Sequence, residues 1–144
     1  AFGTNFVKTM LRLAAGRDEI GVVADQFGRP TWSASVAKAG LAALDLLARD
    51  PSRAGLYHAA GADDASWADL AQATFERAAA LGLPSARVNR ITTADYPTPA
   101  VRPANSRLDS SKFAGLADWQ PMAWSQALDH LLKDLATSQE GPDA

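Results

Sequence analysis

A loop rich in proline and arginine carries the side chains best suited to bind an anion. The segment Val101–Phe113 reads VRPANSRLDSSKF, and three prolines stand in the eight residues that end at Pro103. A guanidinium presented at Arg102 from such a stiffened loop suits bidentate contact with a phosphate. Asn105 and Ser106 add amide and hydroxyl groups that can bond a ribose or a base. The alternative is that Arg102 pairs with a nearby carboxylate and Asn105 makes an Asx turn.

A second polar loop, Asp25–Thr31, reads DQFGRPT and follows a short apolar run. Gly28 permits a backbone turn that other residues resist. Gln26 and Thr31 could exchange hydrogen bonds with a ligand. The alternative is a plain turn, with Thr31 or Ser33 capping the helix that follows.

The remaining candidates are weaker. Asn5 could bond an anion beside a helix N-terminus, or it could simply cap that helix. His58 and His130 have no second imidazole or cysteine at a metal-ligand spacing, which predicts structural or surface histidines and no metal site. The spread of the four tryptophans along the chain favours core and rim packing over a stacking platform.

Catalytic motifs are missing from these 144 residues. No glycine-rich phosphate loop or nucleophile elbow occurs. Tyr57 is followed four residues later by Gly61, and Tyr96 by Ala100, so neither tyrosine forms a Tyr-x-x-x-Lys pair. We expect the chain alone to be inactive in hydride transfer and to have no catalytic residue of its own.

Hydrophobic periodicity predicts the helices that must position these loops. Ser33–Arg49 has the strongest pattern, with an apolar stripe from Val36 to Leu47, and Asp50-Pro51 should end it. Thr4 can cap the first helix and Gly16 can supply a left-handed residue after it. The other expected helices, one preceded by a Ser66–Asp69 capping box, are Asn5–Ala15, Trp67–Leu81, Ser110–Ala114 and Trp124–Ala136.

Strands are predicted at Ile20–Ala24, which is a short apolar run, and at Gly55–Ala60 and Arg87–Thr92. Helices alternating with short strands indicate an α/β fold. We expect one domain over residues 1–137 and a disordered polar tail over residues 138–144.

Composition narrows the function classes. The apolar fraction of 47% and charged fraction of 21% are those of a globular protein. A net charge of -2 and a pI near 5.6 argue against nucleic-acid binding. No apolar run is long enough for a membrane span, so we expect a cytoplasmic protein with no membrane partner. The opening AFGTNFVKTM indicates a chain cut from a larger protein.

Taken in order along the chain, five pieces resemble one family. They are GTNFVKTMLRLA, VVADQFGRPTWSASVA, AGLYHAAGADDASWADLAQATFE, TTADYPTPAVRPANSRLDSSKF and DWQP. Each piece alone is weak, but the five in this order resemble the dTDP-4-dehydrorhamnose reductases, which are extended short-chain dehydrogenase/reductases. The resemblance extends to about Leu135.

The resemblance implies the C-terminal part of an NAD(P)-binding Rossmann-type extended short-chain reductase. Members of that family resemble two-domain enzymes, with a Rossmann half that binds NADPH or NADH and a smaller part that binds the dTDP-sugar. They reduce dTDP-4-dehydro-L-rhamnose to dTDP-L-rhamnose, which feeds cell-surface polysaccharides. The missing Rossmann half and a dTDP-sugar are thus the implied partners, and a homodimer is an open expectation. No cofactor is expected on this chain alone.

The same resemblance suggests roles for six residues of this chain. Asn5 and Arg102 correspond to positions that approach the diphosphate, and Asn105 to one near the nucleoside. Gln26, Arg29 and Thr31 correspond to the loop that closes over the nucleotide.

Two other functions stay open from the sequence. One is a non-catalytic relative, similar to the regulatory β-subunit of methionine adenosyltransferase. The other is a free-standing α/β interaction domain whose loops only resemble the family. An upstream Tyr-x-x-x-Lys pair and a Gly-x-x-Gly-x-x-Gly motif would favour the enzyme.

Overall fold

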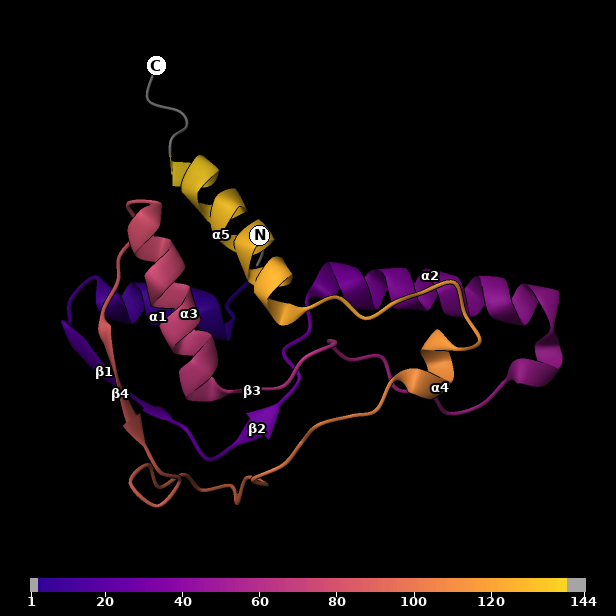
Figure 1. Cartoon of the computed structure of the whole chain (residues 1–144), viewed down its shortest axis with the longest axis horizontal. Helices are drawn as coiled ribbons and strands as arrows, with labels where there is room; N and C mark the ends of the chain where they lie inside the picture. The colour runs from indigo at the N-terminus through magenta and orange to yellow at the C-terminus, as the bar shows by residue number, and fades with distance from the viewer. Residues whose placement is uncertain (1–2, 140–144) are drawn as a thin grey trace.

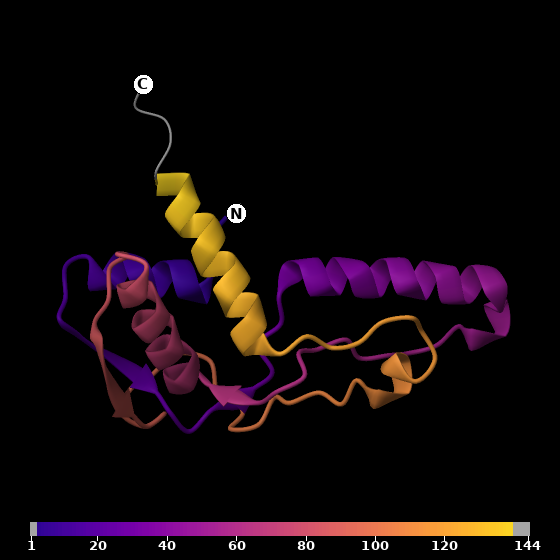
Figure 2. The ribbon, with the colours of Figure 1, turned by 45° about the horizontal axis from the view of Figure 1, so that its top comes forward.

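The computed structural model describes residues 3–139. Helices α1, α3 and α5 gather with a small sheet at one end of the molecule, and helix α2 extends away from them at the other end (Figure 1). Long irregular segments connect the two ends and run below α2 (Figure 2). The polar loops singled out from the sequence lie in this connecting region.

A parallel pair of strands forms the sheet. β1 (Glu19–Val23) pairs with β4 (Arg87–Ile91), with Ile20 opposite Val88. Parallel strands need a long crossover, and here α2 and α3 lie between them in the sequence. α1 (Phe6–Ala14) and α3 (Trp67–Ala80) cover the sheet through a core of Met10, Ile20, Val22, Ala68, Ala71 and Phe75. The predicted strands at both positions are therefore confirmed within one residue.

The capping box predicted before α3 is present. Ser66 Oγ accepts a hydrogen bond from the Asp69 backbone at 3.1 Å, and Asp69 Oδ2 accepts one from the Ser66 backbone at 2.9 Å. α3 then packs against α1 and against α5 (Trp124–Gln139) around the fully buried Leu132. Gly82, at φ +69°, follows α3 where the sequence predicted a stop.

A separate small core joins α2 (Ser33–Arg49) to the one-turn helix α4 (Ser111–Ala114). It contains Ala39, Ala42, Phe113, Ala117 and Trp119, and the Trp119 indole donates to the Ser35 carbonyl at 3.1 Å. The bounds of α2 agree with the sequence prediction. A short 3₁₀ helix, Pro51–Arg53, follows its end.

Much of the apolar stripe of α2 is exposed. Leu41 and Leu44 are 66% and 65% exposed, and Val36 is 48% exposed. The buried face carries the small residues Ser35, Ala39 and Ala42. α2 therefore presents Val36, Leu41 and Leu44 to solvent, because within residues 3–139 its neighbours lie against the face that carries Ala39 and Ala42.

The strand predicted at Gly55–Ala60 is wrong. This segment has no strand partner among residues 3–139, since the β1–β4 sheet lies at the other end of the molecule. Its contacts are with the 3₁₀ helix after α2 and with the α4 region instead: Tyr57 donates its hydroxyl to the Arg53 carbonyl at 2.6 Å, its ring packs on Phe113, and Ala60 N donates to Ser110 Oγ at 2.9 Å. The extra strand pair is antiparallel and joins β2 (Phe27–Gly28) to β3 (Ala65–Ser66).

Two details of the helix ends differ from the prediction. Asn5, rather than Thr4, caps α1, and within the described residues Gly3 and Gly82 alone have positive φ, so Gly16 is not left-handed. α5 continues through Gln139, so Ser138 is helical rather than part of a disordered tail; Ser138 Oγ donates to the Asp134 carbonyl at 2.6 Å. The rest of the predicted tail, residues 140–144, lies outside the described residues.

None of the helices in residues 3–139 has the length and apolar character needed to cross a membrane.

Candidate functional site

The two polar loops meet at a cavity of about 290 Å³ in the region that joins the two ends of the molecule. Three segments that are distant from one another in the sequence bound the cavity. They are the loop after β1, the β3 strand with the start of α3, and the proline-rich loop. Its lining residues are Gln26, Phe27, Gly28, Arg29, Pro30, Ala65, Ser66, Trp67, Leu70, Arg102, Pro103 and Ser106. The sequence therefore pointed to two of the segments that form the cavity.

Backbone hydrogen bonds hold the two loops together. Phe27 N donates to the Ala104 carbonyl at 2.8 Å, and Ser106 N donates to the Phe27 carbonyl at 2.9 Å. Phe27 and Asn105 thus form a parallel β-bridge, and we call these backbone bonds between Phe27 and residues 104–106 the Phe27 seam. A Cβ added at Gly28 would lie 3.0 Å from Ser106 Oγ, so this close approach favours glycine.

Gln26 lies buried at the base of the cavity. It is only 8% exposed, and its side-chain Nε2 donates to Thr93 Oγ1 at 3.0 Å. Thr93 in turn donates its hydroxyl and backbone N–H to Asp25, at 2.7 and 2.9 Å. These bonds from Thr93 lower the pKa of the Asp25 carboxyl. The amide of Gln26 is therefore oriented by a threonine on the segment that follows β4.

Arg102 is the uncompensated cation of the cavity. Its side chain is exposed, and it makes no hydrogen bond or ion pair within residues 3–139. The alternative in which Arg102 pairs with a carboxylate is therefore not the arrangement observed. Pro103 follows directly, and the residues after it are fixed by the Phe27 seam.

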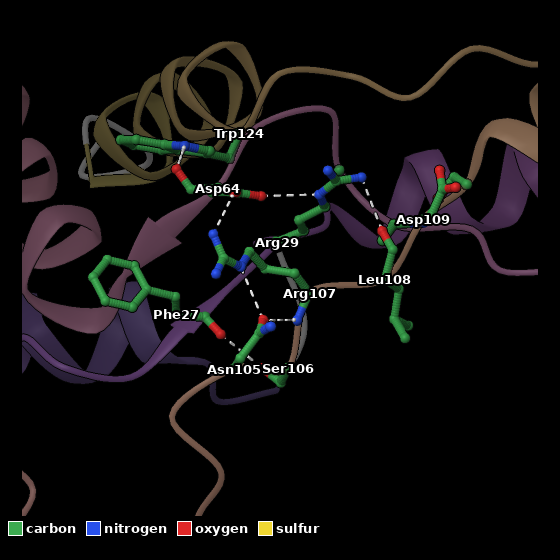
Figure 3. Close-up of polar contacts among 12 residues, drawn as sticks. Phe27, Arg29, Asp64, Asn105, Ser106, Arg107, Leu108, Asp109 and Trp124 are labelled. Atoms are coloured by element: carbon green, nitrogen blue, oxygen red, sulfur yellow. Dashed lines mark hydrogen bonds and ion pairs between the residues drawn. The ribbon is translucent and has the colours of Figure 1, made fainter.

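Arg29 and Arg107 share one carboxylate, that of Asp64 (Figure 3). Arg29 Nε donates to Asp64 Oδ1 and Arg107 Nη1 to Asp64 Oδ2, each at 3.0 Å. The hydrogen bonds from Arg107 and then from Arg29 lower the pKa of the Asp64 carboxyl. Arg29 also donates to the Leu108 carbonyl at 2.9 Å, so its guanidinium spans two segments.

Asn105 makes the Asx turn that was the alternative to ligand binding. Its Oδ1 accepts from the Arg107 backbone N–H at 3.1 Å and from Arg107 Nε at 2.8 Å. It adjoins the cavity without lining it. Its carbonyl oxygen is thus occupied in shaping the loop.

Thr31 braces the loop and caps no helix. Its hydroxyl donates to the Arg29 carbonyl and accepts from the Gly61 N–H, both at 2.9 Å. A Cβ at Gly61 would lie 2.4 Å from the Pro30 carbonyl oxygen, so only glycine fits this crossing without a shift. α2 begins after Trp32 with no side-chain cap. The expectation that Thr31 or Ser33 caps α2 is wrong.

Asn5 lies at the start of α1, apart from the cavity lining. Its Oδ1 accepts from the Lys8 backbone N–H at 2.9 Å, which is the capping alternative. The next residue, Phe6, packs on Trp67 with ring centroids 4.8 Å apart, and Trp67 lines the cavity. Asn5 is therefore connected to the site through one aromatic pair.

Packing contacts account for three other candidates, His130, Trp67 and Trp119. No group of acidic, histidine or cysteine residues in the described part of the chain could hold a metal ion. His130 stacks on Trp32 with centroids 5.3 Å apart. Trp119 is buried in the α2 core, and Trp67 lies at the cavity rim, 41% exposed.

Asp64 and Thr93 are the residues that sequence reasoning missed. Asp64 stands two residues before the predicted capping box, and Thr93 one residue after the predicted strand Arg87–Thr92. Nothing in the sequence links either of them to Arg29 or Gln26, because those contacts span 35 and 67 positions. The assembled site can hold an anion beside a polar, partly aromatic cavity. Its charged side chains are arginines and ion-paired carboxylates, with no nucleophile–base pair.

Comparison with protein families identifies relatives of this chain. The family model described as RmlD substrate binding domain matches residues 1–137. A dTDP-4-dehydrorhamnose reductase of Aggregatibacter actinomycetemcomitans is 45% identical over 133 residues, which are 90% of this chain and 45% of that protein. One from Escherichia coli K12 is 44% identical over 82% of this chain and 42% of its own length. The chain thus spans less than half the length of these relatives.

Solved structures of similar fold carry the same name. A dTDP-4-dehydrorhamnose reductase ortholog of Clostridium acetobutylicum superposes with a TM-score of 0.79 at 31% identity, over 92% of this chain and 44% of that one. The Bacillus anthracis reductase in complex with NADP gives a TM-score of 0.76 at 30% identity, over 93% and 44%. The expected α/β fold, the C-terminal part of an extended short-chain reductase, is thereby confirmed. This chain belongs to the RmlD substrate binding domain family.

Proposed function

We propose that this chain is the dTDP-sugar-binding part of an NADPH- or NADH-dependent reductase that converts dTDP-4-dehydro-L-rhamnose to dTDP-L-rhamnose. Two relatives named dTDP-4-dehydrorhamnose reductase, at 45% and 44% identity, support the substrate class. The complex of the Bacillus anthracis relative with NADP supports NADPH as the cofactor of the longer protein.

One observation carries the proposal: within residues 3–139, Arg102 has no carboxylate partner at the edge of a cavity formed by the two loops. An exposed guanidinium with no internal partner keeps all its donors for a ligand, and a diphosphate matches its forked geometry. Arg102 would thus bind the diphosphate of the dTDP-sugar. The buried Gln26 would set the depth of the cavity beside it.

The other residues suggested by the family resemblance would contact the ligand less directly than Arg102. Arg29 and Thr31 act on the ligand through the loop that their contacts brace. Asn105 stands on the nucleoside side, with its side-chain N–H₂ group left to donate after its oxygen has made the Asx turn. Asn5 approaches the diphosphate only through the N-terminal end of α1, which its own side chain already caps.

Hydride transfer needs a second half. The 144 residues contain no glycine-rich dinucleotide motif and no Tyr-x-x-x-Lys pair, so the acid and the cofactor site would come from a Rossmann half. The exposed stripe of α2 offers an apolar face for that half. The chain alone would then be inactive.

The test is a reductase assay on the longer protein with dTDP-4-dehydro-L-rhamnose, following NAD(P)H oxidation, with the chain alone assayed beside it. Turnover by the longer protein and none by the chain is the expected result. A folded longer protein with no turnover would favour a non-catalytic, regulatory relative. Turnover by the chain alone would contradict the proposal that hydride transfer needs a second half.

A further inference from the structure

We propose that Asp64 is a positioning residue for the dTDP-sugar site: by bridging Arg29 and Arg107, its carboxylate fixes the loop that presents Arg102. This inference rests on the proposed function for the identity of the ligand. Its structural part concerns only how the loop is held.

The bridge is built with matched geometry on both sides. Each oxygen of Asp64 accepts from a different arginine, at 3.0 Å to Arg29 and 3.0 Å to Arg107. The backbone carbonyl of Asp64 also accepts from the Trp124 indole at 3.3 Å, at the start of α5 (Figure 3). Asp64 therefore connects two loops to a helix, with a separate oxygen for each contact.

The bridge supplies what the backbone seam does not. The bonds between Phe27 and residues 104–106 fix the course of the chain, whereas the side chain of Arg107 is held by Asn105 Oδ1, 2.8 Å from its Nε, and by Asp64. Together Asn105 and Asp64 hold that guanidinium 5.7 Å from the centroid of the Phe27 ring, where it covers the exposed aromatic face. The segment just after Pro103 is thus fixed on both its backbone and its side-chain sides.

The charge distribution points the same way. Asp64 compensates Arg29 and Arg107, and the hydrogen bonds from both keep the pKa of its carboxyl low, so it stays ionised at neutral pH. Arg102 has no such partner in the part of the chain that the structure describes. Asp64 therefore pairs with Arg29 and Arg107 and leaves Arg102 available to bind an anion.

An isolated exposed ion pair contributes little to stability. The proposal therefore depends on the sharing of the Asp64 carboxylate by Arg29 and Arg107. Asp129 offers the matched control. It makes a single exposed ion pair with Arg77, at 2.7 Å between α3 and α5, and neither residue lines the cavity. Asp64→Asn keeps the size of the side chain and removes its charge. Asp64→Glu keeps the charge and tests the geometry.

The first readout needs no ligand. In the 144-residue chain, amide hydrogen exchange at Phe27 and Ser106 should be faster in Asp64→Asn than in wild type or Asp129→Asn, since both amides lie in the seam that the bridge supports. Asp64→Glu should restore part of the protection. Unchanged exchange in Asp64→Asn would overturn the inference whatever the ligand is.

The second readout is affinity for dTDP in the longer reductase. Asp64→Asn should weaken dTDP binding about threefold to tenfold and raise KM while kcat stays unchanged, with Asp129→Asn like wild type. Faster exchange with unchanged or tighter dTDP binding would overturn the positioning role. A wild type that binds no dTDP would instead overturn the proposed function, and the exchange data would still decide whether Asp64 holds the loop.

Discussion

Arg29 and Arg102 line the same cavity, but only Arg29 is paired with a carboxylate. Arg29 Nε lies 3.0 Å from Asp64 Oδ1 and Nη1 lies 2.9 Å from the Leu108 carbonyl, so its guanidinium is occupied within the protein. Arg102 has no such contact within residues 3–139. The two arginines therefore have different tasks, one shaping the loop and the other available to a ligand.

The capping box of α3 should contribute measurably to stability. Ser66 is 1% exposed and bonds Asp69 in both directions, at the rim of the cavity. Ser66→Ala should lower the free energy of unfolding by about 1 kcal/mol, because an orphan N–H of the first turn loses its partner. Urea unfolding of both proteins measures this. A variant as stable as wild type would show that the box is not formed in solution.

Stability should depend on pH through the paired carboxylates. The pKa values lowered from the ordinary 3.8 are those of Asp25, Asp50, Asp64, Asp69, Asp95 and Asp109. A carboxyl whose pKa is lower in the folded state contributes stability above the unfolded value, and this stability is lost as the pH falls through the folded value.

The free energy of unfolding should therefore be nearly constant from about pH 7 to pH 5 and fall below about pH 4. Urea unfolding across this range measures it, and Asp64→Asn should show a smaller acid loss than wild type. A steep fall already between pH 7 and pH 5 would assign the pH dependence to other groups.

The exposed stripe of α2 should matter to the longer protein more than to this chain. Leu41→Gln and Leu44→Gln together change two side chains that are 66% and 65% exposed, so the chain alone should lose at most about 0.5 kcal/mol. The longer reductase should lose more, because the stripe would then face its Rossmann half.

Ala39→Gln on the opposite face is the control for this stripe. Ala39 is 4% exposed in the α2 core, so the larger side chain should destabilise the chain itself by overpacking. Thermal unfolding of both proteins distinguishes the faces. An equal effect of the leucine changes on the chain and on the longer protein would show that the stripe has no partner there.

The sequence was most informative where local rules decide the structure. Periodicity and Asp50-Pro51 fixed the bounds of α2, and Ser66 with Asp69 marked the start of α3, because helix ends depend on residues a few positions apart. Arg102 and Gln26, which the two polar loops and the family resemblance singled out, line the cavity, and their roles in binding stay predictions.

The failures arise where distant contacts decide. The segment Gly55–Ala60 has strand composition but no strand beside it within residues 3–139. Asp64 was missed because its two arginine partners lie 35 and 43 positions away. A local pattern cannot report which face finds a neighbour or which carboxylate finds a cation.

The most direct test of the central claim is dTDP binding by the longer reductase with Arg102→Ala, measured by calorimetry beside NADPH binding. Arg17→Ala, an exposed arginine outside the cavity lining, is the control. Affinity for dTDP should fall at least about tenfold in Arg102→Ala, because a charged hydrogen bond to the diphosphate is lost, while NADPH binding and the control stay at wild-type values. An unchanged affinity for dTDP, or an equal loss for dTDP and NADPH, would contradict the assignment of Arg102 to the diphosphate.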